Sequence, residues 1–150
     1  MFVLVRHADA VAKKAWRGPD VDRPLSPLGH QQSAHIVDAL ADVALSELIS
    51  SPTVRCRQTL QPLAAARGLP IVDDPRLARD ASVGALLSAL GRCDDGVLWC
   101  THGELFDQLA AAATEHDAAP FLPTAQTAKG GVWIVHRDRG PRYVGPIPPG

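Results

Sequence analysis

The stretch MFVLVRHADA, residues 1–10, opens with a continuous apolar run and turns polar at Arg6 and His7. An apolar run without alternation is typical of a strand that is buried on both faces of a sheet. A second run of this kind, GVLWC at residues 96–100, is followed by His102. The sequence therefore predicts two buried strands, each with a histidine just beyond its carboxyl end.

Strand-like and helix-like segments alternate along the chain. Such alternation predicts an α/β fold with a mainly parallel central sheet and helices on both faces. We expect one domain over residues 1–145 and a flexible tail, PIPPG, at residues 146–150. Further strands are expected near residues 47–50, 69–72, 131–135 and 142–144, and helices near 27–42, 52–67, 83–90 and 104–115.

Composition excludes several classes of protein. With 150 residues, 46% of them hydrophobic and 21% charged, the chain is typical of one globular domain. A net charge of -1 gives no basic field for nucleic acid or for an anionic membrane. The start lacks the long apolar stretch of a signal peptide, so we expect a cytoplasmic protein. Cys56, Cys93 and Cys100 form neither a CxxC pair nor a C-x5-R loop, so neither structural zinc nor a cysteine phosphatase is expected.

Basic side chains follow three of the predicted strands. Arg6 and His7 follow the first strand, Arg55 lies where a helix opens after the second, and His102 follows the strand at 96–100. Parallel sheets bind ligands at the carboxyl ends of their strands, so these side chains should converge. Arginine offers a planar fork of donors to phosphoryl oxygens, and neutral histidine is a nitrogen nucleophile near pH 7. Two arginines disfavour the imidazolium by repulsion, so we expect a phosphoryl site with a histidine nucleophile.

Four motifs follow one another along the chain: LVRHADA at residues 4–10, DRPLSPLGHQQ at 22–32, SSPTVRCRQT at 50–59 and WCTHGE at 99–104. Their order resembles that in the histidine phosphatase (phosphoglycerate mutase-like) superfamily. The small size and Arg23-Pro24-Leu25 are most similar to the SixA-like branch of protein phosphohistidine phosphatases. Three segments, AWRGPDVDRPL, VRCRQTLQPLAA and KGGVW, also resemble the histidine-phosphatase domain of some actinobacterial Nudix hydrolases, although no Nudix box is present.

The resemblance implies roles for four residues. His7 would be the nucleophile that becomes phosphorylated, while Arg6, Arg55 and His102 would bind the transferring phosphoryl group. The implied reaction is two in-line displacements, in which His7 expels the leaving group and water then hydrolyses the phosphohistidine. This scheme requires neither a metal nor a cofactor.

The proton donor is open between two carboxylates. The phosphomonoester branch of the family places a glutamate after a leucine in the segment that follows the third strand, and here Asp80 is the nearest carboxylate. Glu104, beside His102, is the competitor. An alkoxide needs a proton more than the imidazole that leaves a phosphohistidine, so an ill-defined acid favours a phosphoramidate or another substrate with a good leaving group.

The loop after the nucleophile carries Trp16 and Arg17. This loop is either a solvated basic segment or a rim that binds an acidic substrate, and Arg23 is expected to support the phosphate clamp. With Arg6, Arg55, His102 and Glu104, these residues complete the expected substrate-binding set.

Three functions stay open. The chain is a phosphatase of protein phosphohistidine, a phosphatase of nucleotides or other small phosphomonoesters, or a phosphate-binding module without turnover. The corresponding partner is a phosphorylated protein or a small phosphorylated metabolite, with neither nucleic acid nor membrane involved. We expect a monomer or a weak dimer.

Overall fold

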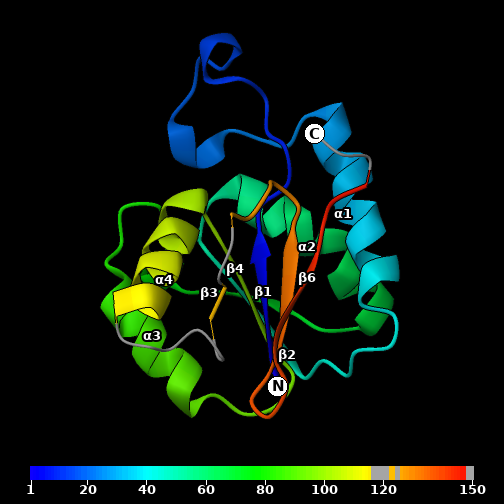
Figure 1. Cartoon of the computed structure of the whole chain (residues 1–150). Coiled ribbons are helices and arrows are strands. Elements are labelled where there is room, and N and C mark those ends of the chain that lie inside the picture. Colours follow the sequence, from blue (N-terminus) through cyan, green and yellow to red (C-terminus); the bar gives the residue numbers. More distant parts are fainter. Residues whose placement is uncertain (116–121, 124–125, 148–150) are drawn as a thin grey trace.

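Six strands form one sheet in the computed structural model, which describes residues 1–115, 122–123 and 126–147 (Figure 1). Their order in space is β3-β2-β4-β1-β5-β6. The first four in this order run parallel, β5 is antiparallel to β1, and β6 is antiparallel to β5. The predicted mainly parallel sheet is confirmed. The strands are β1 (Phe2–Arg6), β2 (Glu47–Ser50), β3 (Ile71–Asp73), β4 (Val97–Thr101), β5 (Val132–His136) and β6 (Gly140–Val144).

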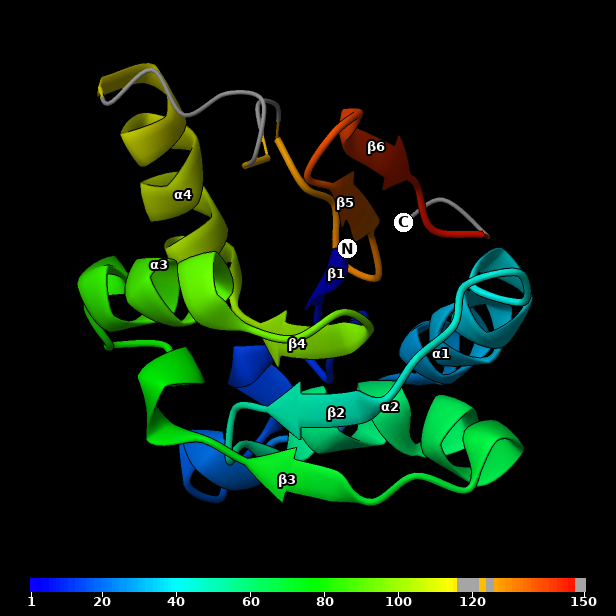
Figure 2. The ribbon, with the colours of Figure 1, turned by 90° about the horizontal axis from the view of Figure 1, so that it is seen from below.

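Helices cover both faces of the sheet, as the alternating pattern predicts. Figure 2 shows α1 and α2 on one face and α3 and α4 on the other. The helices are α1 (Pro27–Ala39), α2 (Val54–Arg67), α3 (Val83–Arg92) and α4 (Gly103–Glu115), with short 3-10 helices η1 (Lys13–Ala15), η2 (Asp20–Asp22) and η3 (Pro75–Leu77).

Alternate residues of β1 supply two separate hydrophobic cores. Phe2 and Leu4 pack in the core that lies beneath α3 and α4, together with Trp99. Val3 and Val5 pack in the core beneath α1 and α2. A strand that feeds two cores must be apolar at every position, which explains the unbroken run at the start of the sequence.

The starts of two helices bear on the site. Ser26 is the N-cap of α1, where its Oγ accepts from the N–H of Gly29 at 3.0 Å. The helix expected from about residue 52 begins later, because Thr53 is the N-cap of α2. The Ser51 hydroxyl contacts His102 instead, and so belongs to the site.

A long connection, residues 8–25, joins β1 to α1 and is called the arm below. It projects beyond the carboxyl ends of the parallel strands, at the top of Figure 1. Its base is closed by a bond from the Val11 N–H to the Pro24 carbonyl at 2.9 Å and by a bridge between Ala10 and Leu25. The arm therefore stands over the sheet edge where ligands are expected.

The predicted domain limits stay a prediction, because residues 148–150 of the expected tail lie outside the described residues. Within the described ranges, every helix is too short or too polar to cross a membrane.

Candidate active site

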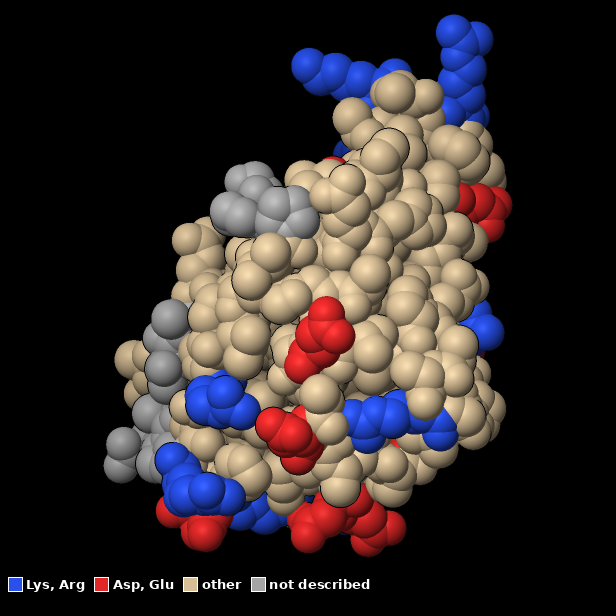
Figure 3. Space-filling view, turned by 90° about the vertical axis from the view of Figure 1, so that its right-hand side faces the viewer, with Lys and Arg blue, Asp and Glu red and all other residues tan. Residues whose placement is uncertain are grey.

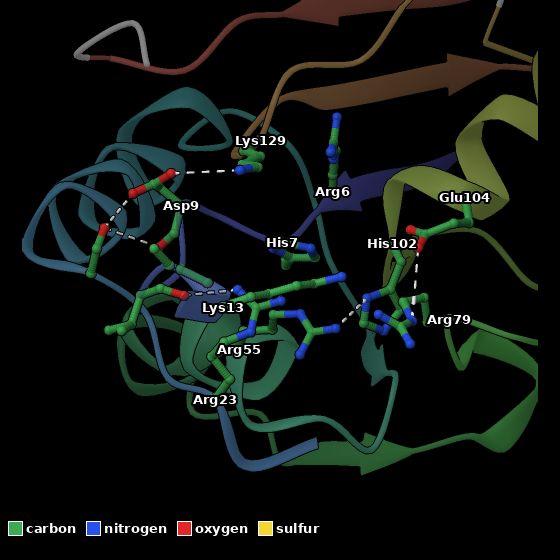
Figure 4. A pocket seen from close by; sticks show the side chains of 14 residues that line it. Arg6, His7, Asp9, Lys13, Arg23, Arg55, Arg79, His102, Glu104 and Lys129 are labelled. Carbon is green, nitrogen blue, oxygen red and sulfur yellow. Dashed lines mark hydrogen bonds and ion pairs between the residues drawn. The ribbon is translucent and has the colours of Figure 1, made fainter. Parts of the chain in front are cut away.

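A cavity of about 580 Å³ opens at the carboxyl ends of β1 and β4, beneath the arm (Figure 4). Arg6, His7, Arg55 and His102 all line it, although they come from distant parts of the sequence. The predicted convergence of these four side chains is therefore what the structure shows. The charged and histidine side chains of the wall are Arg6, His7, Asp9, Lys13, Arg23, Arg55, Arg79, His102, Glu104 and Lys129.

His7 is held as a neutral imidazole. Its Nδ1 lies 2.8 Å from the Ala8 carbonyl. Since a carbonyl only accepts, Nδ1 carries the proton and Nε2 keeps its lone pair. Burial is the largest cause that lowers the pKa of His7, from 6.5 to about 4; His102 and Arg55 lower it further, against the raising effects of Cys56 and the Ala8 carbonyl. Repulsion by arginine therefore acts in the expected direction, but burial is the greater cause.

His102 is fixed from two sides. Its Nε2 lies 2.9 Å from Ser51 Oγ, and its Nδ1 lies 3.5 Å from Nη2 of Arg55. Because a guanidinium only donates, Nδ1 accepts and Nε2 donates to the serine. The rings of His7 and His102 meet edge to face, with centroids 5.3 Å apart. The two histidines therefore flank one space.

The two predicted clamp arginines retain unused donors. Nη1 of Arg6 donates to the Thr127 carbonyl at 2.7 Å, yet the Nε–H groups of Arg6 and Arg55 are buried without a partner among the described residues. A Cβ at Gly103 would lie 2.8 Å from Cζ of Arg6, so glycine leaves the room that this guanidinium occupies. Buried unpaired donors beside a cavity suit a bound oxyanion.

The backbone around the nucleophile is braced from both sides. The Ala8 N–H donates to Thr59 Oγ1 of α2 at 2.9 Å. From the β5 side, the Gly130 N–H lies 3.1 Å from the carbonyls of both Arg6 and His7. Gly130 has a φ of 79°, a conformation that favours glycine. The imidazole is therefore carried by a turn that is hydrogen-bonded on both sides.

Two more of the predicted residues line the cavity. Arg23 is largely buried, and its Nη1 donates to the Val11 carbonyl at 2.8 Å. Glu104, in the first turn of α4, forms an ion pair with Nε of Arg79 at 3.8 Å. Both side chains are therefore part of the cavity wall.

The remaining predicted residues lie elsewhere. Trp16, Arg17 and Asp80 are not among the described residues that line the cavity. The Trp16 indole donates to the Pro19 carbonyl at 2.9 Å, while Arg17 and Asp80 are exposed. Figure 3 shows basic side chains that project at the arm's end of the molecule. The roles assigned to these three residues stay predictions.

Sequence reasoning missed Arg79 and Asp9 as residues of the cavity. Arg79 follows β3, whose carboxyl end meets the same sheet edge, and that position was the available signal. Asp9 accepts from Ser26 Oγ at 2.6 Å and pairs with Lys129 Nζ at 3.7 Å. In the described part of the chain, no group of three or more His, Cys, Asp or Glu side chains could hold a metal ion.

Known proteins share this architecture. An 8-oxo-(d)GTP phosphatase from Mycolicibacterium smegmatis is 30% identical over 146 residues, which are 92% of this chain and 44% of that protein. The chain thus spans less than half the length of this curated relative. A SixA from Agrobacterium tumefaciens, a phosphohistidine phosphatase by name, superposes with a TM-score of 0.69 at 28% identity, over 99% of this chain and 97% of that one.

A SixA in complex with tungstate shares the fold, with a TM-score of 0.67 at 22% identity, over 97% of this chain and 94% of that one. A sequence model of the histidine phosphatase superfamily (branch 1) matches residues 2–87, more than half of the chain. On this match and on the fold, the chain belongs to branch 1 of the histidine phosphatase superfamily.

Proposed function

We propose that the chain is a phosphatase that works through a phosphohistidine at His7 and acts on protein phosphohistidine. The observation that carries the proposal is a neutral His7, with its Nε2 lone pair free, in one cavity with Arg6, Arg55 and His102. A nucleophile needs its lone pair at the working pH, and a phosphoryl group needs cations around its oxygens.

The proposed reaction consists of two successive displacements at phosphorus. Nε2 of His7 attacks phosphorus, and the P–N bond to the substrate imidazole breaks as that imidazole leaves with the bonding electrons and takes up a proton. Arg6 and Arg55 donate to the phosphoryl oxygens while charge spreads over them, and His102 holds Arg55 through the contact between its Nδ1 and Nη2 of that arginine. Water then attacks phosphorus, the bond to His7 breaks, and inorganic phosphate leaves.

The carboxylates near the cavity favour a leaving group that needs little acid catalysis. Asp9 is engaged by Ser26 and Lys129, and Glu104 by Arg79. Of the two predicted donors, Glu104 lines the cavity and Asp80 does not, so we assign Glu104 as the proton donor. The imidazole that leaves a phosphoramidate needs less protonation than an alkoxide, so a single donor that is paired with Arg79 suits a phosphoramidate better than an alkyl phosphate.

A second candidate is the hydrolysis of nucleotides or other small phosphomonoesters. The cavity of about 580 Å³ is large enough for a small molecule, and Lys13 and Lys129 add cations beyond the clamp. The relative from Mycolicibacterium smegmatis is named for an oxidised nucleotide. Pyrophosphate-type leaving groups also need little help from an acid.

Cytoplasmic location is part of the proposal, because all three cysteines are free thiols in this structure.

Competing substrates decide between the two candidates. Phosphate release would be measured from a phosphohistidine protein, a nucleoside triphosphate panel and an aryl phosphate, with His7→Ala as the blank. We expect the highest kcat/KM on the phosphohistidine protein and a trapped phosphohistidine at His7. A faster reaction on a nucleotide would favour the second candidate, and equal rates for His7→Ala would overturn both.

The proton donor is tested on the aryl phosphate. Glu104→Gln should lower kcat about tenfold, a modest effect for general acid catalysis, whereas Asp80→Asn should leave it within about twofold. The reverse order of the two variants would reassign the donor to Asp80.

A further inference from the structure

One carboxylate outside the predicted site touches three arginines. Asp20 lies on η2 of the arm, and its side-chain oxygens contact Arg55 Nη2 at 3.1 Å, Arg23 Nε at 3.1 Å and Arg79 Nη1 at 3.5 Å. Its backbone carbonyl also accepts from Nη1 of Arg55 at 2.9 Å. A single residue thus engages both terminal nitrogens of Arg55 and one nitrogen each of two other cavity arginines.

Asp20 reaches these arginines from outside the cavity. It is not among the described residues that share the cavity with His7. It lines instead a smaller hollow of about 210 Å³, together with Lys13, Trp16, Gly18 and Arg23. The carboxylate therefore contacts the guanidinium groups from a neighbouring hollow, and it is not part of the lining around His7.

Three arginines in one wall repel one another unless an anion lies between them. Burial raises the pKa of Asp20, but Arg55 and Arg23 lower it more, so its pKa lies below the ordinary value and the group is ionised at pH 7. The ionised carboxylate offsets the repulsion and fixes the direction of each guanidinium.

The arm holds Asp20 in place. The Arg23 N–H donates to the Asp20 carbonyl at 3.1 Å and closes the short turn of η2. The indole of Trp16 donates to the Pro19 carbonyl, directly before this turn. The position of the carboxylate is therefore set by the fold of the arm and not by a flexible side chain alone.

We propose that Asp20 is a positioning residue, which orients Arg55, Arg23 and Arg79 so that their remaining N–H groups face a phosphoryl group bound beside His7. The inference rests on the proposed function, because it assumes that the cavity binds phosphate. Asp20 touches the arginines and not the reacting atoms, so it acts on phosphate affinity through them. The arm is thereby coupled to the catalytic centre through Asp20.

The test compares two substitutions on the same turn. Asp20→Asn removes the charge beside the arginines, while Asp22→Asn removes the same charge two residues away at an exposed position. Binding of inorganic phosphate would be measured by calorimetry, and steady-state kinetics with an aryl phosphate. For Asp20→Asn we expect the Kd of phosphate and the KM to rise about tenfold, as for a lost hydrogen bond between charged groups, with kcat within about threefold. Asp22→Asn should stay within about twofold of wild type, and Asp20→Glu should recover part of the loss.

Phosphate binding by Asp20→Asn at wild-type strength or tighter would overturn the positioning role. An equal loss in Asp22→Asn would also overturn it, since net charge alone would then explain the effect. If Asp20→Asn folds poorly, Arg79→Gln is made in wild type and in Asp20→Glu, and the phosphate affinity of each protein is measured. Full additivity of the two effects on the free energy of phosphate binding would refute the coupling between Asp20 and Arg79. Failure of the wild-type protein to bind phosphate would overturn the proposed function itself, whereas wild-type binding with an unaffected Asp20→Asn would overturn the inference alone.

Discussion

Acidification should destabilise the protein through the nucleophile. His7 has a pKa of about 4 in the folded state against 6.5 ordinarily, mainly because it is buried. Between these two pH values the unfolded chain binds a proton that the folded chain does not, so stability falls as pH falls from about 6.5 to 4. At pH 4.5 the loss from this residue is about 2.5 kcal/mol relative to pH 7, and it vanishes above pH 6.5.

The assay is urea unfolding at pH 7.0 and pH 4.5 for wild type and for His7→Gln, which cannot titrate at this position. The difference between the two proteins isolates His7 from every other group. His30→Gln, at an exposed site on α1, is the matched control and should keep the wild-type dependence on pH. An identical loss of stability in wild type and His7→Gln would refute the argument.

The same pKa predicts the pH profile of catalysis. With a pKa of about 4, about 97% of His7 is neutral at pH 5.5, against about 9% for an ordinary histidine. The acid limb of kcat/KM, which reports the free enzyme, should therefore fall near pH 4. A limb near pH 6.5 would contradict the assignment of a buried neutral nucleophile.

Two further substitutions test the architecture of the site. Gly103→Ala places a Cβ 2.8 Å from Cζ of Arg6, so phosphate affinity should drop about tenfold or more. Gly91→Ala on α3, which has open space around it, should leave phosphate affinity unchanged. Calorimetry with phosphate measures both affinities, and similar values for the two variants would contradict a clash with Arg6. Thr59→Val leaves a buried N–H beside the nucleophile without its acceptor, so the free energy of unfolding should fall by about 1–3 kcal/mol. Thr114→Val, at an exposed site on α4, should cost less than about 0.5 kcal/mol, and equal losses in urea unfolding would show that the buried bond is unimportant.

The sheet and the four central residues were predictable because they depend on local and topological rules. The unbroken apolar run of β1 reflects burial on both faces, and parallel strands bring their carboxyl ends to one edge. Those two rules suffice to place Arg6, His7, Arg55 and His102 together, whatever the lengths of the loops between them.

The residues around the centre depend on geometry that no sequence period encodes. Arg79 and Asp80 are neighbours, and only the first lines the cavity, because the chain after η3 decides which side chain turns inward. The Trp16 side chain stays within the arm, because its indole donates a hydrogen bond to the Pro19 carbonyl. Burial is the main cause of the lowered pKa of His7, and burial likewise depends on packing in three dimensions rather than on the neighbours of His7 in the chain.

The hydrogen bonds from Gly130 to the carbonyls of Arg6 and His7 bear on how this domain can be shortened or rearranged. The residues assigned to the reaction lie between Arg6 and Glu104, yet the turn that carries His7 is hydrogen-bonded to Gly130, in the segment leading into β5. A truncated protein that kept every reactive side chain but ended before that segment would lose these hydrogen bonds. The imidazole of His7 would then no longer be held in its orientation. Cutting and rejoining the chain is better attempted at the β5–β6 turn, which lies at the opposite end of β5.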